Sequence, residues 1–228
     1  MAVITESGLR AARLWMVEQL LEPRGIRDPR VLGAMRRVER HRFVDESLQA
    51  RAYGPYALPI GCGQKTPHPH TVAAMAESLA LGGSERVLEI GTGCGYQTAI
   101  LALLAREVLS LECLPELAAD AERRLREMGF ANVRIGVRAD LRWPGAASFD
   151  AIHVSAAVPE VPGSLLAQLG AGGRLVLPVG RGSIQRLQVL GRSGDTITTT
   201  GLGSCRFQPL LGKLLPGMRP GRTAAGQG

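Results

Sequence analysis

Three alternating glycines, with acidic residues before and after them, are the part of the sequence best suited to chemistry. Gly91, Gly93 and Gly95 follow a short apolar run that contains Glu89. Glycine permits a sharp backbone turn and a close approach of a ligand to the main chain. A helix-forming run follows at residues 97–104, and the start of a helix offers free N–H groups. The stretch therefore predicts a nucleotide- or nucleoside-binding corner of an open parallel sheet.

The spacing and charge around this corner narrow the ligand. The Gly-Lys-Ser/Thr pattern of nucleotide hydrolases is absent, and the glycines depart from the Gly-x-Gly-x-x-Gly fingerprint of dinucleotide sites. Glu89 would repel a pyrophosphate but attract a cationic ligand. Glu112 lies 112 − 91 = 21 residues after the first glycine, where a carboxylate can accept hydrogen bonds from both ribose hydroxyls. Asp140 ends the third predicted strand and is placed to read an adenine amino group.

An adenosine ligand without phosphate but with positive charge describes S-adenosylmethionine, whose ammonium and sulfonium groups are both cationic. We therefore expect this methyl donor as the cofactor. The alternative is a plain nucleotide-binding fold with ordinary acids at its strand ends. The residues expected to bind the donor are Glu89, Gly91, Thr92, Gly93, Gly95, Glu112, Asp140 and Leu141.

The elements that position this corner alternate between strands and helices. Strands are expected at residues 87–90, 108–111, 133–137, 149–155 and 174–179, and helices at 71–81, 97–104, 118–128 and 162–169. This alternation predicts an α/β fold with a parallel sheet. The later strands, at residues 187–190, 196–200 and 204–207, have no helices between them and predict an antiparallel edge.

A helical section at residues 8–50 precedes the sheet. Apolar spacing predicts a helix at residues 9–21, Asp28-Pro29 opens a second helix, and a third short helix starts near residue 42. Residues 53–70 are rich in glycine and proline and predict a structured loop with little regular structure. This loop also carries Lys65, Thr66 and His68, so it is either part of a site or a rigid linker.

Composition favours one soluble domain. The chain has 228 residues, 45% of them hydrophobic, with a net charge of +7. We expect one domain over residues 1–215 and a disordered tail over 216–228. The arginines are spread along the chain, so we expect no nucleic-acid partner. We also expect a monomer, without a signal peptide or membrane span.

The cysteines and histidines give no metal signature. None of the four cysteines forms a CxxC pair, which argues against zinc and favours reduced thiols in the cytoplasm. His68 and His70 lack an evident third ligand, so we expect no metal there. His153, in the fourth predicted strand, is expected to pack in the core rather than act as a base.

Six segments along the chain carry a recognisable pattern: residues 40–44 (RHRFV), 57–64 (ALPIGCGQ), 87–99 (VLEIGTGCGYQTA), 149–157 (FDAIHVSAA), 175–180 (LVLPVG) and 206–210 (RFQPL). In these segments and in their order, the chain resembles the protein-L-isoaspartate O-methyltransferases. The resemblance implies a seven-stranded Rossmann-like, doubly wound methyltransferase sheet. It also implies cytoplasmic repair of damaged proteins or peptides: methylation of L-isoaspartyl carboxyls, followed by cyclisation to a succinimide that hydrolyses partly to aspartate.

This chain departs from the family pattern at the acceptor side. Pro67 stands where the family usually has an active-site serine, Pro55 where it favours an acid, and Leu141 where it favours a glycine. A carboxylate, with a reference pKa near ~4, is already ionised at neutral pH and needs no general base. Thr66 or His68 could donate the missing hydrogen bond, so the candidate catalytic residues are Thr66, Pro67 and His68.

Three functions remain open from the residues and the resemblance together. The first is an isoaspartyl carboxyl methyltransferase with a repacked acceptor loop, which the extent of the resemblance favours. The second is a methyltransferase of the same fold that acts on another acceptor, such as a modified peptide or a natural-product carboxylate. The third is a non-catalytic donor-binding protein that recognises damaged chains.

Overall fold

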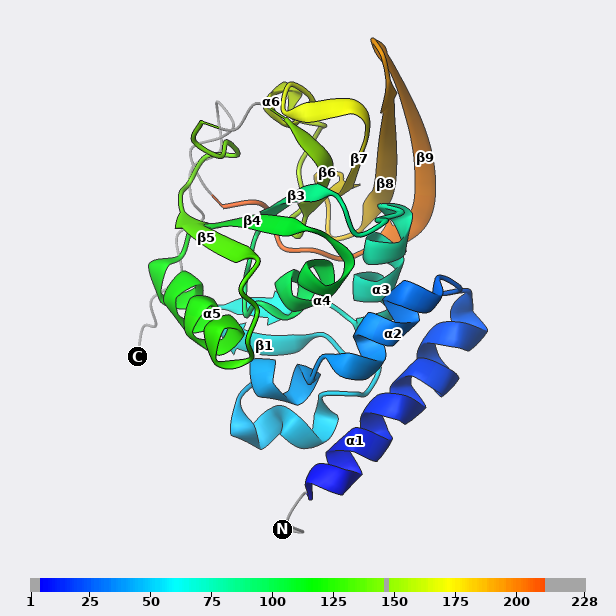
Figure 1. Cartoon of the computed structure of the whole chain (residues 1–228), viewed down its shortest axis with the longest axis vertical. Helices are drawn as coiled ribbons and strands as arrows, with labels where there is room; N and C mark the ends of the chain where they lie inside the picture. The colour runs from blue at the N-terminus through cyan, green and yellow to red at the C-terminus, as the bar shows by residue number, and fades with distance from the viewer. Residues whose placement is uncertain (1–4, 146–147, 212–228) are drawn as a thin grey trace.

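A seven-stranded mixed sheet forms the centre of the molecule in the computed structural model, which describes residues 5–145 and 148–211 (Figure 1). The spatial order of the strands is β5-β4-β3-β6-β7-β8-β9. Their bounds are β3 Arg86–Ile90, β4 Glu107–Glu112, β5 Val133–Val137, β6 Phe149–Val154, β7 Leu169–Val179, β8 Gln185–Ser193 and β9 Thr196–Cys205. The pairs from β5 to β7 are parallel, whereas β8 and β9 pair antiparallel. The Rossmann-like sheet with an antiparallel edge is therefore confirmed.

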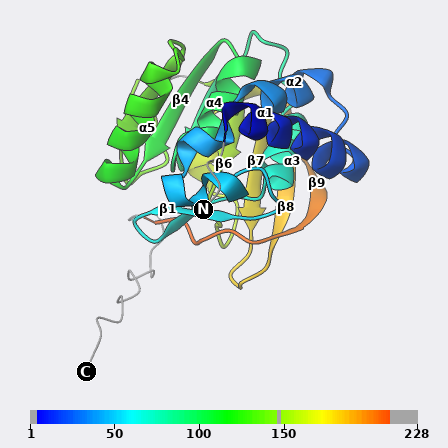
Figure 2. The ribbon, with the colours of Figure 1, turned by 90° about the horizontal axis from the view of Figure 1, so that it is seen from below.

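Side chains alternate between the two faces of the sheet, and each face packs against its own cover. Val87, Val108 and Ala151 join the core beneath the helices, whereas Leu88 and Ile152 join a second core. Leu141 and the short helix α6 (Gly163–Leu166) help to cover the second core. On the helical side, α4 (Tyr96–Leu104) lies between α5 (Pro115–Glu127) and the N-terminal helices (Figure 2).

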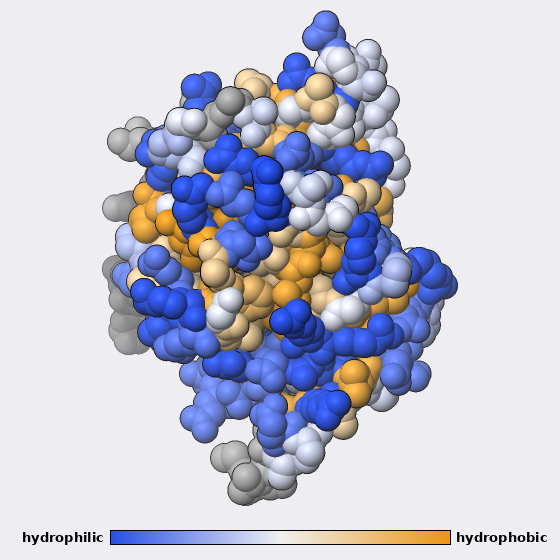
Figure 3. All heavy atoms as spheres, in the orientation of Figure 1, coloured by the Kyte–Doolittle hydropathy of each residue, from blue (hydrophilic) through white to orange (hydrophobic). Residues whose placement is uncertain are grey.

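The predicted N-terminal helical section is present. Helix α1 (Glu6–Trp15) continues as a π-helical segment, Met16–Leu21, and a 3-10 turn, Glu22–Arg24. Helix α2 (Pro29–Arg37) starts where Asp28-Pro29 predicted, because the Asp28 side chain accepts a hydrogen bond from the Arg30 N–H. The third short helix is two 3-10 segments, Arg40–Phe43 and Glu46–Arg51. On the face of the molecule that Figure 3 shows, hydrophilic residues dominate the lower part, around the N-terminal helices.

The proline-rich loop is more regular than predicted. Residues 58–66 form a hairpin of β1 (Leu58–Gly61) and β2 (Gln64–Thr66). Its turn has positive φ angles at Cys62 (49°) and Gly63 (68°). A cysteine rarely adopts this conformation, which is why the turn chemistry did not reveal the hairpin. Helix α3 (Pro69–Ser78) then begins two residues earlier than expected.

The predicted strand breaks near the C-terminus were also wrong. Strand β7 runs through the glycines at residues 170–173, and β9 is continuous through Gly201 and Gly203. Gly201 and Gly203 pair with Gln188 and Leu187 of β8, with one irregularity at that point. The glycines of β7 lie at a shift of register instead, since Leu169 pairs with Phe149 and Arg174 with Ala151. The predicted disordered tail, residues 216–228, lies outside the described residues. Within the described ranges, no helix combines the length and apolar character needed to cross a bilayer.

Candidate functional site

The glycine turn connects β3 to α4 in the conformation that its composition predicted. Gly91, Gly93 and Gly95 have φ angles of +88°, +55° and +91°, in the left-handed region that favours glycine. A Cβ on Gly93 would lie 3.1 Å from Ile60 Cδ1 of the hairpin. A Cβ on Gly95 would lie 3.3 Å from Ala121 Cβ of α5. Glycine is therefore required here both by backbone conformation and by space.

A cavity of about 420 Å³ opens beside this turn. Its walls come from six segments, lying between residues 57 and 67, 90 and 97, 111 and 117, 138 and 141, 155 and 156, and 206 and 211. Among the predicted donor-binding residues, those on the wall are Gly91, Thr92, Gly93, Glu112, Asp140 and Leu141. Gly95 is not on the wall, because it caps α4 and packs toward α5.

Glu112 lies at the end of β4 and faces the glycine turn. Its Oε2 atom accepts a hydrogen bond from the Gly93 N–H at 2.8 Å. Its Oε1 atom accepts from the N–H groups of Cys113 (2.8 Å) and Leu114 (3.0 Å). These bonds fix the carboxylate on the cavity wall, where it can accept further hydrogen bonds from a ligand hydroxyl.

Glu89 differs from the predicted arrangement. It is fully buried and is not among the residues that line the cavity. Its Oε2 atom accepts hydrogen bonds from Thr98 Oγ1 and Ser110 Oγ, both at 2.6 Å, whereas Oε1 has no hydrogen-bond partner among the residues that the structure describes. Burial raises the pKa of Glu89 to about 7. The carboxylate thus joins β3, β4 and α4 instead of facing a ligand.

Glu89 also acts on the glycine turn through its neighbours. Ser110, which donates to Glu89, lies 2.6 Å from Thr92 Oγ1, so a hydrogen-bonded chain leads from the core to the cavity wall. On its other side, Glu89 is in register with His153 of β6. His153 is fully buried, and burial lowers its pKa to about 3. The expectation of a packed core histidine is therefore confirmed.

Asp140 lies on the cavity wall but is already paired. The Arg138 guanidinium donates to both of its carboxylate oxygens, at 2.8 and 2.7 Å. These hydrogen bonds lower the pKa of Asp140. Leu141 is buried beside it, and its carbonyl accepts a hydrogen bond from Gln168 Nε2 at 2.7 Å. A carboxylate oxygen has more than one lone pair, so Asp140 can still accept from a ligand amino group.

The structure separates the three candidate catalytic residues. Thr66 and Pro67 line the cavity, whereas His68 does not. His68 caps α3, and its Nδ1 atom accepts a hydrogen bond from the His70 N–H at 3.1 Å. Burial lowers the pKa of His68. The cap therefore explains why His68 is held away from the position that the sequence suggested for it.

Sequence reasoning missed the segment Arg206 to Leu211, which lies on the cavity wall. The Gln208 carbonyl accepts from the Ala157 N–H at 2.8 Å, and the Gln208 side chain donates to the Gly63 carbonyl at 2.8 Å. The C-terminal segment thus reaches the tip of the hairpin. Its match to the family's order was the available signal, but its side chains alone indicate no particular chemistry.

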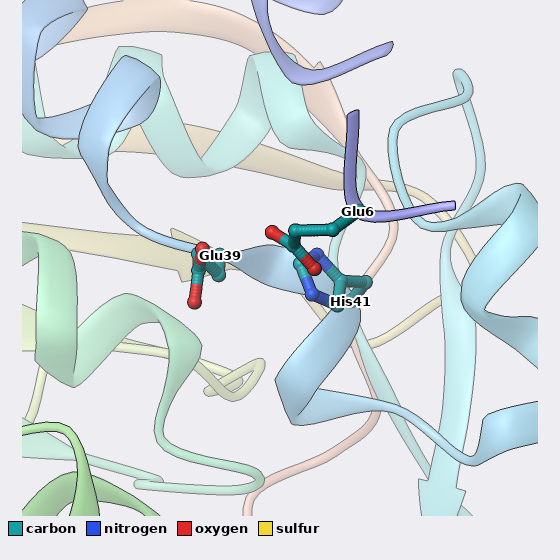
Figure 4. Close-up of side chains that lie close together, drawn as sticks. All are labelled: Glu6, Glu39 and His41. Atoms are coloured by element: carbon teal, nitrogen blue, oxygen red, sulfur yellow. The ribbon is translucent and has the colours of Figure 1, made fainter. Parts of the chain in front are cut away.

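A separate cluster of Glu6, Glu39 and His41 has the composition of a metal site (Figure 4). Glu39 is already paired with Arg13 at 3.3 Å and with Arg42 at 3.5 Å. His41 Nδ1 lies 2.6 Å from the Tyr53 hydroxyl. The two arginines balance the two carboxylates, so the cluster lacks the excess negative charge that would attract a cation.

Comparison with known proteins supplies the family context. Residues 12–215 match the family model described as protein-L-isoaspartate(D-aspartate) O-methyltransferase. Protein-L-isoaspartate O-methyltransferase 2 of Marinobacter nauticus is 50% identical over 201 residues, covering 87% of this chain and 92% of the relative. Protein-L-isoaspartate O-methyltransferase 1 of Syntrophobacter fumaroxidans is 48% identical, covering 89% of this chain and 95% of the relative.

Solved structures agree with the fold. One protein-L-isoaspartate O-methyltransferase structure superposes with a TM-score of 0.78 at 24% identity, covering 90% of this chain and 67% of that one. A Plasmodium falciparum structure, described as a putative enzyme of this kind in complex with S-adenosyl-L-homocysteine, gives a TM-score of 0.73 at 24% identity. It covers 87% of this chain and 97% of that one. At this identity, the likeness supports the shared architecture alone.

Proposed function

The chain belongs to the protein-L-isoaspartate(D-aspartate) O-methyltransferase family, and we propose that it methylates the free carboxylate of L-isoaspartyl residues in damaged proteins. It is an S-adenosylmethionine-dependent methyltransferase, and its role is protein repair. One observation carries the proposal to this chain: the glycine turn and Glu112 share a single cavity with the hairpin residues Thr66 and Pro67. The residues proposed to bind the donor and those proposed to bind the acceptor therefore line the same cavity.

The residues present fit the donor. Glu112 is fixed by three backbone N–H groups and can accept hydrogen bonds from ribose hydroxyls. The absence of a side chain on Gly93 leaves room between the turn and Ile60. Asp140 lies on the cavity wall, and we assign it the hydrogen bond from the adenine amino group. When bound, S-adenosylmethionine supplies an electrophilic methyl group on a positively charged sulfur.

Methyl transfer to a carboxylate requires the two reactants to be correctly oriented, and it requires no proton transfer. An acceptor carboxylate oxygen forms a bond to the methyl carbon while the carbon–sulfur bond breaks and its electron pair stays on sulfur. The products are a methyl ester and a neutral thioether, and no proton is transferred. Correct placement of two reactants can supply about 7–11 kcal/mol of the barrier. We assign Thr66 the hydrogen bond to the acceptor, because it carries a hydroxyl group and is one of the β2 residues that line the cavity.

The resulting ester explains how such transfer serves repair. An isoaspartyl methyl ester cyclises to a succinimide, and water opens this ring partly to normal aspartate. The proposed substrates are therefore damaged proteins and peptides. We place the activity in the cytoplasm and take the monomer as the working unit. The four free cysteines fit a reducing compartment.

The test is transfer of tritiated methyl from S-adenosylmethionine to an isoaspartyl peptide and to its aspartyl twin. We expect label in the isoaspartyl peptide and background label in the twin. Equal or absent labelling would contradict the proposal. Pro67 on the cavity wall favours one second candidate, a methyltransferase for a different carboxylate acceptor, which label in another peptide or small carboxylate would support.

A further inference from the structure

Arg40 is a fully buried cation that no step of the proposed function has used. It opens the 3-10 turn Arg40–Phe43 and has 0% exposure. Within the described part of the chain, no carboxylate forms an ion pair with it. Removing a lone charge from water costs several kcal/mol. A buried arginine without a counter-ion therefore calls for an explanation.

The guanidinium instead binds backbone carbonyls on both sides of the hairpin. It donates to the carbonyl of Ala52, to Tyr56 O at 3.3 Å and to Pro67 O at 2.8 Å. Ala52 and Tyr56 precede β1, whereas Pro67 follows β2. Arg40 thus fastens both ends of the hairpin at one point.

The same guanidinium faces the start of the helix that follows the glycine turn. Its central carbon lies 5.4 Å from the centroid of the Tyr96 ring, a cation–π arrangement. Tyr96 and Pro67 both line the cavity. Arg40 therefore contacts both the hairpin and the donor corner, that is, the glycine turn with the start of α4.

Burial affects both the pKa of Arg40 and the screening of its charge. Burial lowers the pKa of Arg40, but arginine remains protonated at neutral pH. In a low-dielectric interior its field is weakly screened. Among the cavity-lining cations, Lys65 and Arg206 are exposed, and Arg138 is paired with Asp140. Salt screens exposed charges, and a paired charge is partly neutralised, so these three cations contribute less than Arg40 to the electrostatic field in the cavity at high salt.

We infer that Arg40 positions the methyl acceptor: it fixes the hairpin against the donor corner, and its uncompensated charge favours a carboxylate beside Pro67. This inference rests on the proposed function, because the anion it assigns to the cavity is the isoaspartyl α-carboxylate. Arg40 acts through the hairpin and through its field, without being a catalytic residue.

The test compares two peptides on the protein loaded with S-adenosylhomocysteine, by calorimetry. One peptide carries an isoaspartyl residue, and its twin carries the α-carboxamide in place of the carboxylate. The wild type should prefer the carboxylate about 10-fold or more. Arg40→Gln, which keeps hydrogen-bond donors but loses the charge, should reduce this preference to within about twofold of unity. Arg40→Lys should keep it.

Arg42→Gln is the matched control, because it removes an exposed positive charge from the same turn. It should leave the preference unchanged. Unchanged affinity of Arg40→Gln for S-adenosylhomocysteine would show that the donor corner of this variant is still correctly folded. An Arg40→Gln protein with the wild-type preference would overturn the inference.

A second measurement needs no variant. The wild-type preference should persist in about 0.5 M NaCl, since a buried charge is screened little. Loss of the preference in salt would assign it to the exposed cations and overturn the inference, even where Arg40→Gln does not fold. If the wild type methylates no isoaspartyl peptide, the proposed function itself fails. If it methylates the peptide but Arg40→Gln keeps the preference, only the inference fails.

Discussion

At the scale of single residues, two carboxylates near the donor corner have different tasks because of where they lie. Glu112 ends its strand at the cavity wall, while Glu89 lies within its strand and is enclosed by Thr98 and Ser110. Both were predicted to touch the donor. The sequence shows which residues are acidic, but the direction of a side chain depends on strand register. Only the structure shows that Glu89 faces α4.

Glu112→Ala should weaken binding of S-adenosylhomocysteine by roughly 1.5–3 kcal/mol, because it removes charge-assisted hydrogen bonds to the ligand and to the turn. Calorimetric titration measures this change. Glu116→Ala is the control, since Glu116 is exposed in the first turn of α5 and does not line the cavity. Equal affinity in the wild type and Glu112→Ala would refute the ribose assignment.

Pro67→Ser should raise isoaspartyl methylation several-fold, because it adds a hydroxyl to the cavity wall where the family usually has serine. The rate of tritiated methyl transfer at saturating donor measures it. Pro59→Ser, on the exposed side of β1, should have no effect. If Pro67→Ser brings no gain, the hairpin was rebuilt around a different hydrogen-bond donor, and Thr66 is the residue to test next.

Glu89 should make stability depend on pH in an unusual direction. Its folded pKa of about 7 lies above the ordinary value of 4.5, so the folded protein holds a proton that the unfolded chain releases. This contribution to stability is complete below pH 4.5, falls as the pH rises from 4.5 to 7, and is absent above that range. The total is a few kcal/mol.

Glu89→Gln removes this titration while keeping the shape of the side chain. We expect the variant to be more stable than the wild type at about pH 8, with the difference vanishing near the ordinary glutamate pKa. Urea unfolding at both pH values measures it. Glu122→Gln, an exposed residue of α5, controls for the loss of one negative charge. A difference that does not vary with pH would disprove the buried titration.

At the scale of elements, the parallel part of the fold follows from the sequence and the hairpin does not. Asp28-Pro29 predicted the start of α2 because a cap and a proline act locally. The hairpin turn depends on Cys62 in a left-handed conformation, which local preference disfavours. Two hydrogen bonds to residues distant in sequence stabilise the hairpin instead, one from Arg40 to Pro67 and one from Gln208 to Gly63. Sequence patterns of short range cannot reveal such contacts.

The junction between the glycine turn and α5 can be tested with a pair of glycines. Gly129→Ala should cost about 1–2 kcal/mol of stability through backbone strain alone, because its φ is +79° and no atom of the described residues lies within 4 Å of the added Cβ. Gly95→Ala carries similar backbone strain at +91° and also crowds Ala121 and Leu125. We expect a larger loss of unfolding free energy in urea, together with weaker donor binding. Equal losses would show that contact with α5 is not what requires glycine.

At the scale of the whole molecule, the cavity joins parts of the chain that are far apart in sequence. The C-terminal segment meets the hairpin through the hydrogen bond from Gln208 to Gly63, whose residues are 145 positions apart. Both segments line the cavity or its rim. The wall proposed to hold the acceptor therefore includes the segment that follows the antiparallel strands β8 and β9, which carry no residue proposed to bind the donor.

Gln208→Ala should raise the KM for an isoaspartyl peptide about fivefold, since one net hydrogen bond of about 1 kcal/mol is lost between the two walls. The free energy of unfolding should fall by no more than about 1 kcal/mol, because Gln208 is exposed and loses only this side-chain hydrogen bond. Steady-state kinetics with varied peptide measures the effect. Gln188→Ala in β8 serves as the control. An unchanged KM would mean that the hairpin tip and the C-terminal segment act independently.

The assembly of one cavity from six segments has a consequence for folding. No contiguous fragment contains all of its walls, and closing contacts over such separations demands that most of the chain be ordered first. Binding competence should therefore be a property of the cooperative folded state. On heating, the loss of S-adenosylhomocysteine binding and the loss of helical circular dichroism should coincide at one midpoint. Loss of binding at a temperature well below the helical midpoint would reveal a partly folded state, in which the cavity is disrupted while the helices remain folded.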